Sequence, residues 1–233
     1  MSWHGEFYFG DYWAAFRGGT EDNSVHAHAA IQICLSDGLP ATLQGANAQE
    51  TIGNALVVNP GVQHRLLPIS RIMLVFVEPH SPFGQWLLTA VNEDIAILPA
   101  SITEKIQLKG PIQNTLDNVF SLLGAPCSAV DERLVRALKY LKKNARERSF
   151  TEAARSVGLS APRLRALAKE QLGVPLTKLL AWHQLNSAAR ELATGATLAD
   201  AAYAAGYADQ AHFTRAMRNL VGVTPKAAQR PLV

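Results

Sequence analysis

Residues 200–225 read DAAYAAGYADQAHFTRAMRNLVGVTP, and this stretch decides how the C-terminal part of the chain folds. The alanine pair at 201–202 lets two helices approach closely, and Gly206 permits the positive φ of a tight turn. Asp209 is a suitable N-cap for a second helix, which Gly222 would end. The stretch therefore predicts a short helix, a glycine turn and a longer helix set at a steep angle.

The same pattern occurs earlier, where residues 152–174 read EAARSVGLSAPRLRALAKEQLGV. Matching residues are 48 positions apart up to the turn glycine and 49 apart further on, because one residue is inserted. Ser149 and Glu152 form a capping box before the first copy, and a long helix from about Pro175 to Thr194 joins the copies. Single helix-turn-helix pairs also occur in purely structural proteins. Two joined copies predict a double helix-turn-helix unit whose second helices enter the major groove of DNA.

Charge divides the chain into an acidic and a basic part. Residues 1–129 carry 5 Lys and Arg against 11 Asp and Glu, a net charge of −6. Residues 130–233 carry 17 against 8, a net charge of +9. This division indicates a polyanionic partner for the C-terminal part alone. A basic, solvated surface without a partner is the alternative that charge by itself leaves open.

The N-terminal half contains short apolar runs separated by Gly, Pro and Asn, at residues 25–35, 55–58 and 71–77. Such runs are typical of an all-β sandwich or barrel. Apolar residues at helical spacing from Ile112 to Leu123 predict a connecting helix, which Gly124-Ala125-Pro126 would end. We therefore expect an α+β protein with a β-barrel region at residues 1–128 and an all-α region at residues 129–233.

The C-terminal hundred residues, about 131–230, resemble the AraC family of bacterial transcriptional regulators. The resemblance is densest at Asp200-Ala201-Ala202, from Gly206 to Arg215, at Arg218, and at Gly222-Val223-Thr224-Pro225. It implies seven helices, with both recognition helices in successive major grooves on one face of the DNA. The chain departs from the family pattern at Ala166 and His183, where Arg is usual, at Ala168, where an aromatic is usual, and at Ala228, a tyrosine position. These departures put the DNA contacts of the first unit in question more than its fold.

The residues that we expect to contact DNA lie near the start of each second helix, where base edges are reached. In the second unit they are Gln210, His212 and Arg215, with Arg218 on a phosphate. Gln pairs bidentately with adenine and Arg with guanine. In the first unit they are Arg163 and Arg165, and the resemblance implies that the position of Arg165 reads bases.

Histidines mark a second candidate site in the acidic half. In a predicted strand over residues 25–35, His26 and His28 share a face with Gln32 and Cys34, while Val25, Ile31, Ile33 and Leu35 form the core face. This spacing, and the later run from Gly53 to His64, resemble the two cupin motifs. The resemblance implies a site of His26, His28, Gln32 and His64 for Zn, Ni, Mn or Fe. Lining of an organic-effector pocket and a purely structural role are the alternatives.

Together these features indicate a transcription regulator whose partners are duplex DNA, a small-molecule or metal effector, and RNA polymerase. A homodimer joined through the connecting helix 112–123 or the barrel would suit paired DNA sites. The alternative is a metal-dependent cupin enzyme, oxygenase-like, with a basic helical appendage. Two cysteines, no signal-peptide pattern and no long apolar run favour a cytoplasmic location. Effector, operator and sign of regulation stay open.

Overall fold

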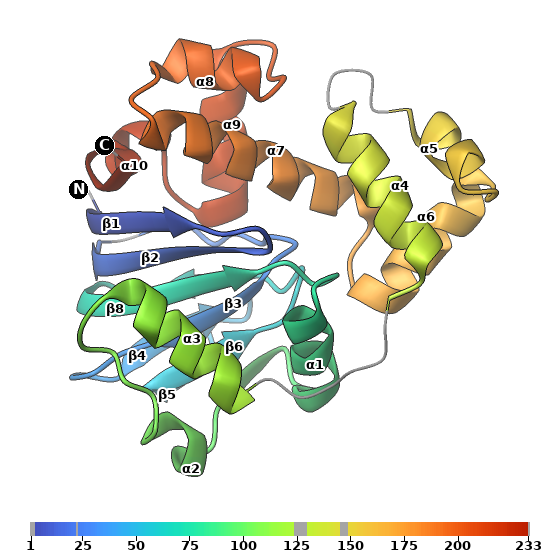
Figure 1. The fold of residues 1–233 in the computed structure, drawn as a ribbon. Coiled ribbons are helices and arrows are strands. Elements are labelled where there is room, and N and C mark those ends of the chain that lie inside the picture. Colours follow the sequence, from blue (N-terminus) through green and yellow to red (C-terminus); the bar gives the residue numbers. More distant parts are fainter. Residues whose placement is uncertain (1–2, 22, 124–129, 145–148, 233) are drawn as a thin grey trace.

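The computed structural model describes residues 3–21, 23–123, 130–144 and 149–232. Strands dominate its first part and helices its second, which confirms the predicted order of fold classes (Figure 1). The larger sheet has six antiparallel strands in the order β1 (His4–Phe9), β2 (Trp13–Thr20), β8 (Ile69–Val77), β3 (Ile31–Leu35), β6 (Ala55–Val58) and β9 (Ile95–Ile97). The smaller sheet has the order β5 (Glu50–Gly53), β4 (Ala41–Gly45) and β7 (His64–Leu66).

The larger sheet is buried on both faces because its central strands are apolar at odd and even positions. In β8, Met73 and Val75 belong to one core, whereas Leu74 and Phe76 belong to another. The first core is covered by α1 (Pro82–Ala90), which lies between β8 and β9 in the chain, and by α3 (Ile112–Leu123), which follows β9 and the short α2 (Ala100–Thr103). The second core continues without a break into the C-terminal helices. The sheets and the helical part therefore share packed apolar surface.

Three apolar residues of the connecting helix α3 face the core of their own chain. Ile112, Leu116 and Val119 are all buried against the sheet of their own chain. The sequence did not reveal that these residues would cover a face of the chain's own sheet. Dimer formation itself stays a prediction. The predicted boundary near residue 128 lies outside the described residues.

The predicted strand over residues 25–35 is also shorter than expected. Only Ile31–Leu35 is a strand, and a bend at Ala29 and Ala30 separates it from His26. His26 forms an isolated bridge to His64, so the chain passes from the smaller sheet to the larger one between His28 and Ile31. Val25 lies outside the core, with 48% of its surface exposed.

The helical part follows the predicted repeat closely. Its helices are α4 (Glu132–Lys143), α5 (Phe150–Ser156), α6 (Ala161–Leu172), α7 (Leu176–Ala193), α8 (Leu198–Ala204), α9 (Gln210–Val221) and α10 (Pro225–Leu232). The turn glycines Gly158 and Gly206 have φ of 71° and 80°, and the helix-ending Gly173 and Gly222 have φ of 73° and 75°. Each copy is thus built on glycines in the left-handed region, where other residues are strained.

Caps confirm the predicted helix starts. The Ser149 hydroxyl accepts a hydrogen bond from the Glu152 N–H, and the Ser160 hydroxyl accepts one from the Arg163 N–H. Among the described residues, no helix combines the length and apolarity that crossing a membrane requires.

Candidate functional site

The second recognition helix, α9, turns a polar face to solvent. Its N-cap Asp209 accepts a hydrogen bond of 2.6 Å from the His212 N–H. The residues predicted to contact DNA on this helix are all exposed: Gln210, His212, Arg215 and Arg218. The opposite face is buried through Phe213, Met217 and Leu220. The four side chains that the sequence analysis selected therefore lie on the accessible face of α9.

The first recognition helix, α6, also exposes its predicted residues, but both arginines have neighbours in the same unit. The guanidinium of Arg163 lies 3.7 Å from a Glu170 carboxylate oxygen. The guanidinium of Arg165 lies over the Phe150 ring, 5.3 Å from its centroid. An exposed cation–π contact contributes about 0.5–1 kcal/mol, less than the about 1–3 kcal/mol of a bidentate contact to guanine. Arg165 is therefore free to leave Phe150 for a base edge.

The three histidines predicted from the cupin resemblance come together beneath the helical part. Their ring centroids lie 4.4 to 5.9 Å apart, and one nitrogen of each lies within 4.8 Å of the others. The Nδ1 atoms of His26, His28 and His64 each face a backbone carbonyl, at 2.8, 2.9 and 3.0 Å. A histidine that donates from Nδ1 to a carbonyl keeps its Nε2 lone pair for a ligand.

Gln32 completes this cluster, which we call the His26 cluster (His26, His28, Gln32 and His64). Its Oε1 lies 2.9 Å from His28 Nε2 and 3.4 Å from His64 Nε2, so a neutral His28 donates either from Nδ1 to the Ala30 carbonyl or from Nε2 to Gln32, and a metal ligand requires the first tautomer. Burial lowers the pKa of His26 to about 4 and lowers the pKa of His28 and of His64. At neutral pH the imidazoles are therefore uncharged, as ligands must be.

Cys34 lies beside the His26 cluster but does not extend it chemically. It is a buried, free cysteine whose Sγ receives a hydrogen bond of 3.1 Å from Gln32 Nε2. Burial raises the pKa of its thiol to about 12, so without a metal the thiol is protonated at neutral pH. Cys127 lies outside the described residues.

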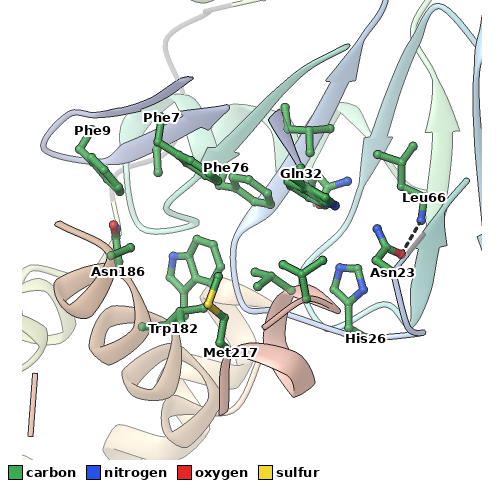
Figure 2. Close-up of a pocket in the computed structure, with 17 residues that line it drawn as sticks. Phe7, Phe9, Asn23, His26, Gln32, Leu66, Phe76, Trp182, Asn186 and Met217 are labelled. Atoms are coloured by element: carbon green, nitrogen blue, oxygen red, sulfur yellow. Dashed lines mark hydrogen bonds between the residues drawn. The ribbon is translucent and has the colours of Figure 1, made fainter. Parts of the chain in front are cut away.

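An apolar cavity adjoins the His26 cluster at the junction of the two parts of the chain (Figure 2). From the sheet side, Phe7, Phe9 and Phe76 line it, and His26 and Gln32 border it. From the helical side come the α7 residues Trp182, Leu185, Asn186 and Ala189, the α9 residues Met217 and Val221, and Val223 just after α9. The same helix α9 thus carries the predicted base-reading residues on one face and part of a cavity wall on the other.

Two buried polar groups of this cavity have no hydrogen-bond partner among the described residues. One is the indole N–H of Trp3, a donor, and the other is Oδ1 of Asn186, an acceptor. Unmade hydrogen bonds of buried groups are costly, by about 1–3 kcal/mol each. The described lining contains no Lys, Arg, Asp or Glu. The cavity thus suits an apolar molecule that carries an uncharged hydrogen-bonding group.

Comparison with known proteins supports the repeat. Residues 153–230 match the family model of a helix-turn-helix domain. This part of the chain is an AraC-type helix-turn-helix domain. The AraC-type domain covers both copies of the repeat and the helix α7 between them, so the expectation of a DNA-binding regulator is confirmed. No curated protein matches the chain by sequence.

Solved structures extend the likeness to the whole chain at the level of fold. An apo variant of ToxT from Vibrio cholerae has a TM-score of 0.62 and 12% identity, and the match covers 96% of this chain and 99% of that chain. Unsaturated fatty acid bound wild-type ToxT from Vibrio cholerae has a TM-score of 0.59 and 12% identity, with 93% and 94% covered. The sheet region and the AraC-type domain therefore occur together in a known fold.

Apart from His26 and Gln32, the sequence did not identify the residues that line the cavity. Trp182 and Met217 fall on the apolar stripes of α7 and α9, and at such positions a residue that lines a cavity looks the same as one that fills a core. Phe7 and Phe9 lie in a strand that was not predicted. Aromatic residues line the cavity from both parts of the chain, but the sequence alone does not show that these two parts meet there.

Proposed function

We propose that an apolar ligand in the cavity between the sheets and the AraC-type domain controls how this regulator binds DNA. The observation that carries the proposal is the shared wall: α9 supplies Met217 to the cavity and Arg215 to the exposed face. A ligand that repositions Met217 also moves Arg215, because both belong to one rigid helix. A ligand shifts the protein only by its differential affinity for the two arrangements, so the shared wall supplies the necessary contact.

The chemistry of the lining favours an uncharged ligand. A carboxylate in this cavity would lose water without gaining a cation among the lining residues, and an uncompensated buried charge costs several kcal/mol. The fatty acid bound to ToxT carries such a carboxylate. In this chain Arg190 does not line the cavity: its guanidinium carbon lies over the Phe9 ring, 5.0 Å from the centroid, and it donates to the Gly10 carbonyl. We therefore favour an alcohol or a similar neutral, largely apolar molecule over the acid.

The test compares an unsaturated fatty acid with the alcohol of the same chain. Binding is measured by calorimetry on the full-length protein, and DNA binding is then measured with and without each compound. We expect the alcohol to bind at least tenfold more tightly and to change DNA affinity. Asn186→Leu should weaken binding of the alcohol, because the substitution removes the unpartnered acceptor and fills part of the cavity.

Three outcomes contradict this proposal in different ways. Tighter binding of the acid would overturn the neutral-ligand class but keep the cavity. Binding of either compound without any change in DNA affinity would overturn the control mechanism. Unaltered binding in Asn186→Leu would place the ligand elsewhere. Ser187→Ala is the control, because Ser187 is the exposed neighbour of Asn186 on α7.

A metal effector in the His26 cluster is the second candidate. It is supported by the three Nδ1–carbonyl contacts, which orient the imidazoles in the way that metal-binding histidines are oriented. Purified protein should then carry about one transition-metal ion, of the Zn, Ni, Mn or Fe group, by elemental analysis. His64→Ala should release it. Metal-free protein from a purification without chelators would exclude this candidate.

The remaining partners follow from the regulator function. RNA polymerase and a second copy of the chain stay predictions, and light scattering with and without DNA tests the homodimer. The alternative of a cupin enzyme predicts a reaction at the His26 cluster. A DNA-shift assay without any substrate separates the two, since a regulator binds its operator without turnover.

A further inference from the structure

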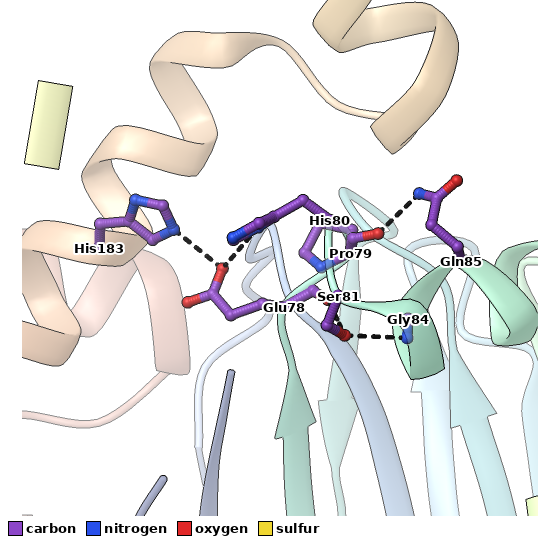
Figure 3. Close-up of polar contacts among 7 residues, drawn as sticks. All are labelled: Glu78, Pro79, His80, Ser81, Gly84, Gln85 and His183. Atoms are coloured by element: carbon purple, nitrogen blue, oxygen red, sulfur yellow. Dashed lines mark hydrogen bonds and ion pairs between the residues drawn. The ribbon is translucent and has the colours of Figure 1, made fainter. Parts of the chain in front are cut away.

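A second group of metal-ligating side chains lies outside the His26 cluster, at the junction between the end of β8 and the middle of α7 (Figure 3). It consists of Glu78, His80 and His183, which we call the junction triad. Glu78 Oε2 lies 2.9 Å from His183 Nε2 and 3.7 Å from His80 Nδ1. One ligand atom of each residue lies within 4.8 Å of the others. The triad is formed only where the two parts of the chain meet.

The turn that carries Glu78 and His80 is held firmly in place. The Glu78 N–H donates to the Tyr12 carbonyl at 2.8 Å. The Ser81 hydroxyl donates to the Glu78 carbonyl at 2.7 Å and accepts from the Gly84 N–H at 3.0 Å. Gln85 Nε2 donates to the carbonyls of Pro79 and of Gln171, at 2.7 and 2.9 Å, which ties the same turn to the AraC-type domain. Two ligands of the triad therefore sit on a preformed turn.

The triad has coordinating capacity that the protein's own contacts leave unused. The side chains of Glu78, His80 and His183 are only 7%, 12% and 10% exposed. His80 Nδ1 and His183 Nδ1 have no hydrogen-bond partner among the described residues. Burial lowers the pKa of His80 to about 4, so its imidazole is uncharged at neutral pH. A structural hydrogen bond between Glu78 and His183 alone would not explain why His80 is buried beside the same carboxylate.

We propose that Glu78, His80 and His183 bind a divalent zinc-like metal ion that fastens the sheet region to α7. Two imidazole nitrogens and one carboxylate oxygen are a known ligand set for zinc, with a fourth position left for water. The nearest ligand atoms come from Glu78 Oε2, His80 Nδ1 and His183 Nε2. Metal binding at His183 Nε2 would displace the proton that this atom shares with Glu78 Oε2, and that proton is released to solvent.

A route from solvent reaches this site. A surface pocket lined by Asp11, Glu78, His183 and Arg190 opens beside it, and Lys142 forms part of the same wall. The positive charges of Lys142 and Arg190 oppose a cation, whereas the carboxylates of Glu78 and Asp11 attract one. Lys142→Gln should therefore tighten metal binding, in contrast to any substitution within the triad.

The experiment must separate this site from the His26 cluster, so it is carried out in full-length protein with His64→Gln as background. After chelator treatment, Zn²⁺ binding is measured by calorimetry, and Co²⁺ is used as a spectroscopic probe of tetrahedral coordination. We expect one Zn²⁺ per chain in this background. Glu78→Gln and His183→Gln should each lower the affinity for Zn²⁺ by at least about 10–100-fold, which is the loss that follows removal of even an outer-shell partner.

Control variants distinguish a folding defect from a loss of metal binding. Glu78→Gln retains an oxygen that accepts from His183, and circular dichroism checks that each variant folds. His183→Cys, which supplies another zinc ligand, should restore Zn²⁺ binding and add a sulfur-to-cobalt absorption band. His4→Gln changes an exposed histidine outside the triad and should have no effect. The proposal is wrong if the background protein binds no Zn²⁺, or if Glu78→Gln and His183→Gln leave its affinity unchanged.

Discussion

The indole ring of Trp182 lies 5.3 Å from the imidazole ring of His28, centroid to centroid, so α7 contacts the sheet region beside the His26 cluster. The same indole lies 5.4 Å from the ring of Phe76. Trp182 is 95% buried through these contacts and the cavity that it lines. The helix that joins the two DNA-reading units is therefore also the helix that contacts the candidate effector site.

Replacing Trp182 should uncouple the ligand from DNA binding. Trp182→Ala removes a buried aromatic side chain, which typically costs about 3–5 kcal/mol of unfolding free energy. We expect lower stability in urea unfolding and a DNA affinity that no longer responds to the ligand. Trp86→Ala is the control, because Trp86 packs with Phe83 in the other core. It should lower stability but keep the response. Loss of the response in both variants would mean that stability alone is responsible.

Gly222 and Gly173 provide a matched pair for testing the junction. Both end a recognition helix with φ near 75°, where Ala costs about 1–2 kcal/mol. A Cβ at Gly222 would lie 2.6 Å from the Ser24 carbonyl oxygen and 2.7 Å from His26 Nδ1, whereas one at Gly173 meets nothing within 4 Å. Gly222→Ala should therefore destabilise the protein more and open the junction to limited proteolysis. An equal loss of unfolding free energy in Gly222→Ala and Gly173→Ala would contradict a close contact at Gly222.

The two recognition helices should contribute unequally to sequence preference. Arg215 of α9 aligns with Ala166 of α6, and both positions are exposed. Arg215→Ala should remove a bidentate contact worth about 1–3 kcal/mol and leave weak, salt-sensitive binding to phosphates. Selection from randomised sites with Arg215→Ala and Arg165→Ala measures this directly. If Arg165→Ala erases more sequence information, the first unit is the main reader.

The cap of α4 should make stability depend on pH in the acid range. Hydrogen bonds from the Arg133 side chain and backbone lower the pKa of Asp131 to about 2, from an ordinary value of 3.8. Since the folded value lies below the unfolded one, the carboxylate stabilises the fold above pH 3.8, and the contribution is lost as pH falls through 2. Asp131→Asn should be less stable than wild type at neutral pH, with a gap that closes in acid. Urea unfolding across this range tests it, and a constant gap would exclude the carboxylate as the cause.

Much of the helical part could be predicted because its determinants are local. Caps such as Ser160 and Asp209 and the turn glycines act within a few residues, so their spacing reveals the repeat. The His26 cluster was also predicted, although His26 and His28 lie outside a strand, because residues 26–32 still turn toward His64 through the bridge between His26 and His64.

The junction could not be predicted, because it depends on how two separately patterned regions pack. Glu78 and His183 are 105 residues apart in the chain, and no sequence motif around either residue indicates that the two are in contact. The sequence did single out His183 as a departure from the AraC pattern, without a partner to explain it. The apolar residues of α3 posed the opposite problem: their burial in the chain's own core looks the same in sequence as a dimer interface.

The position of Met217 between Arg215 and Arg218 on α9 has a consequence for evolution and for engineering. If a ligand in this cavity controls DNA binding as proposed, a lineage that acquires a bulkier ligand would have to reshape the cavity at Met217, on the same helix that carries Arg215. New inducer preference and new promoter preference would then tend to arise together. A biosensor designer who redesigns this cavity should therefore reselect the operator in the same round.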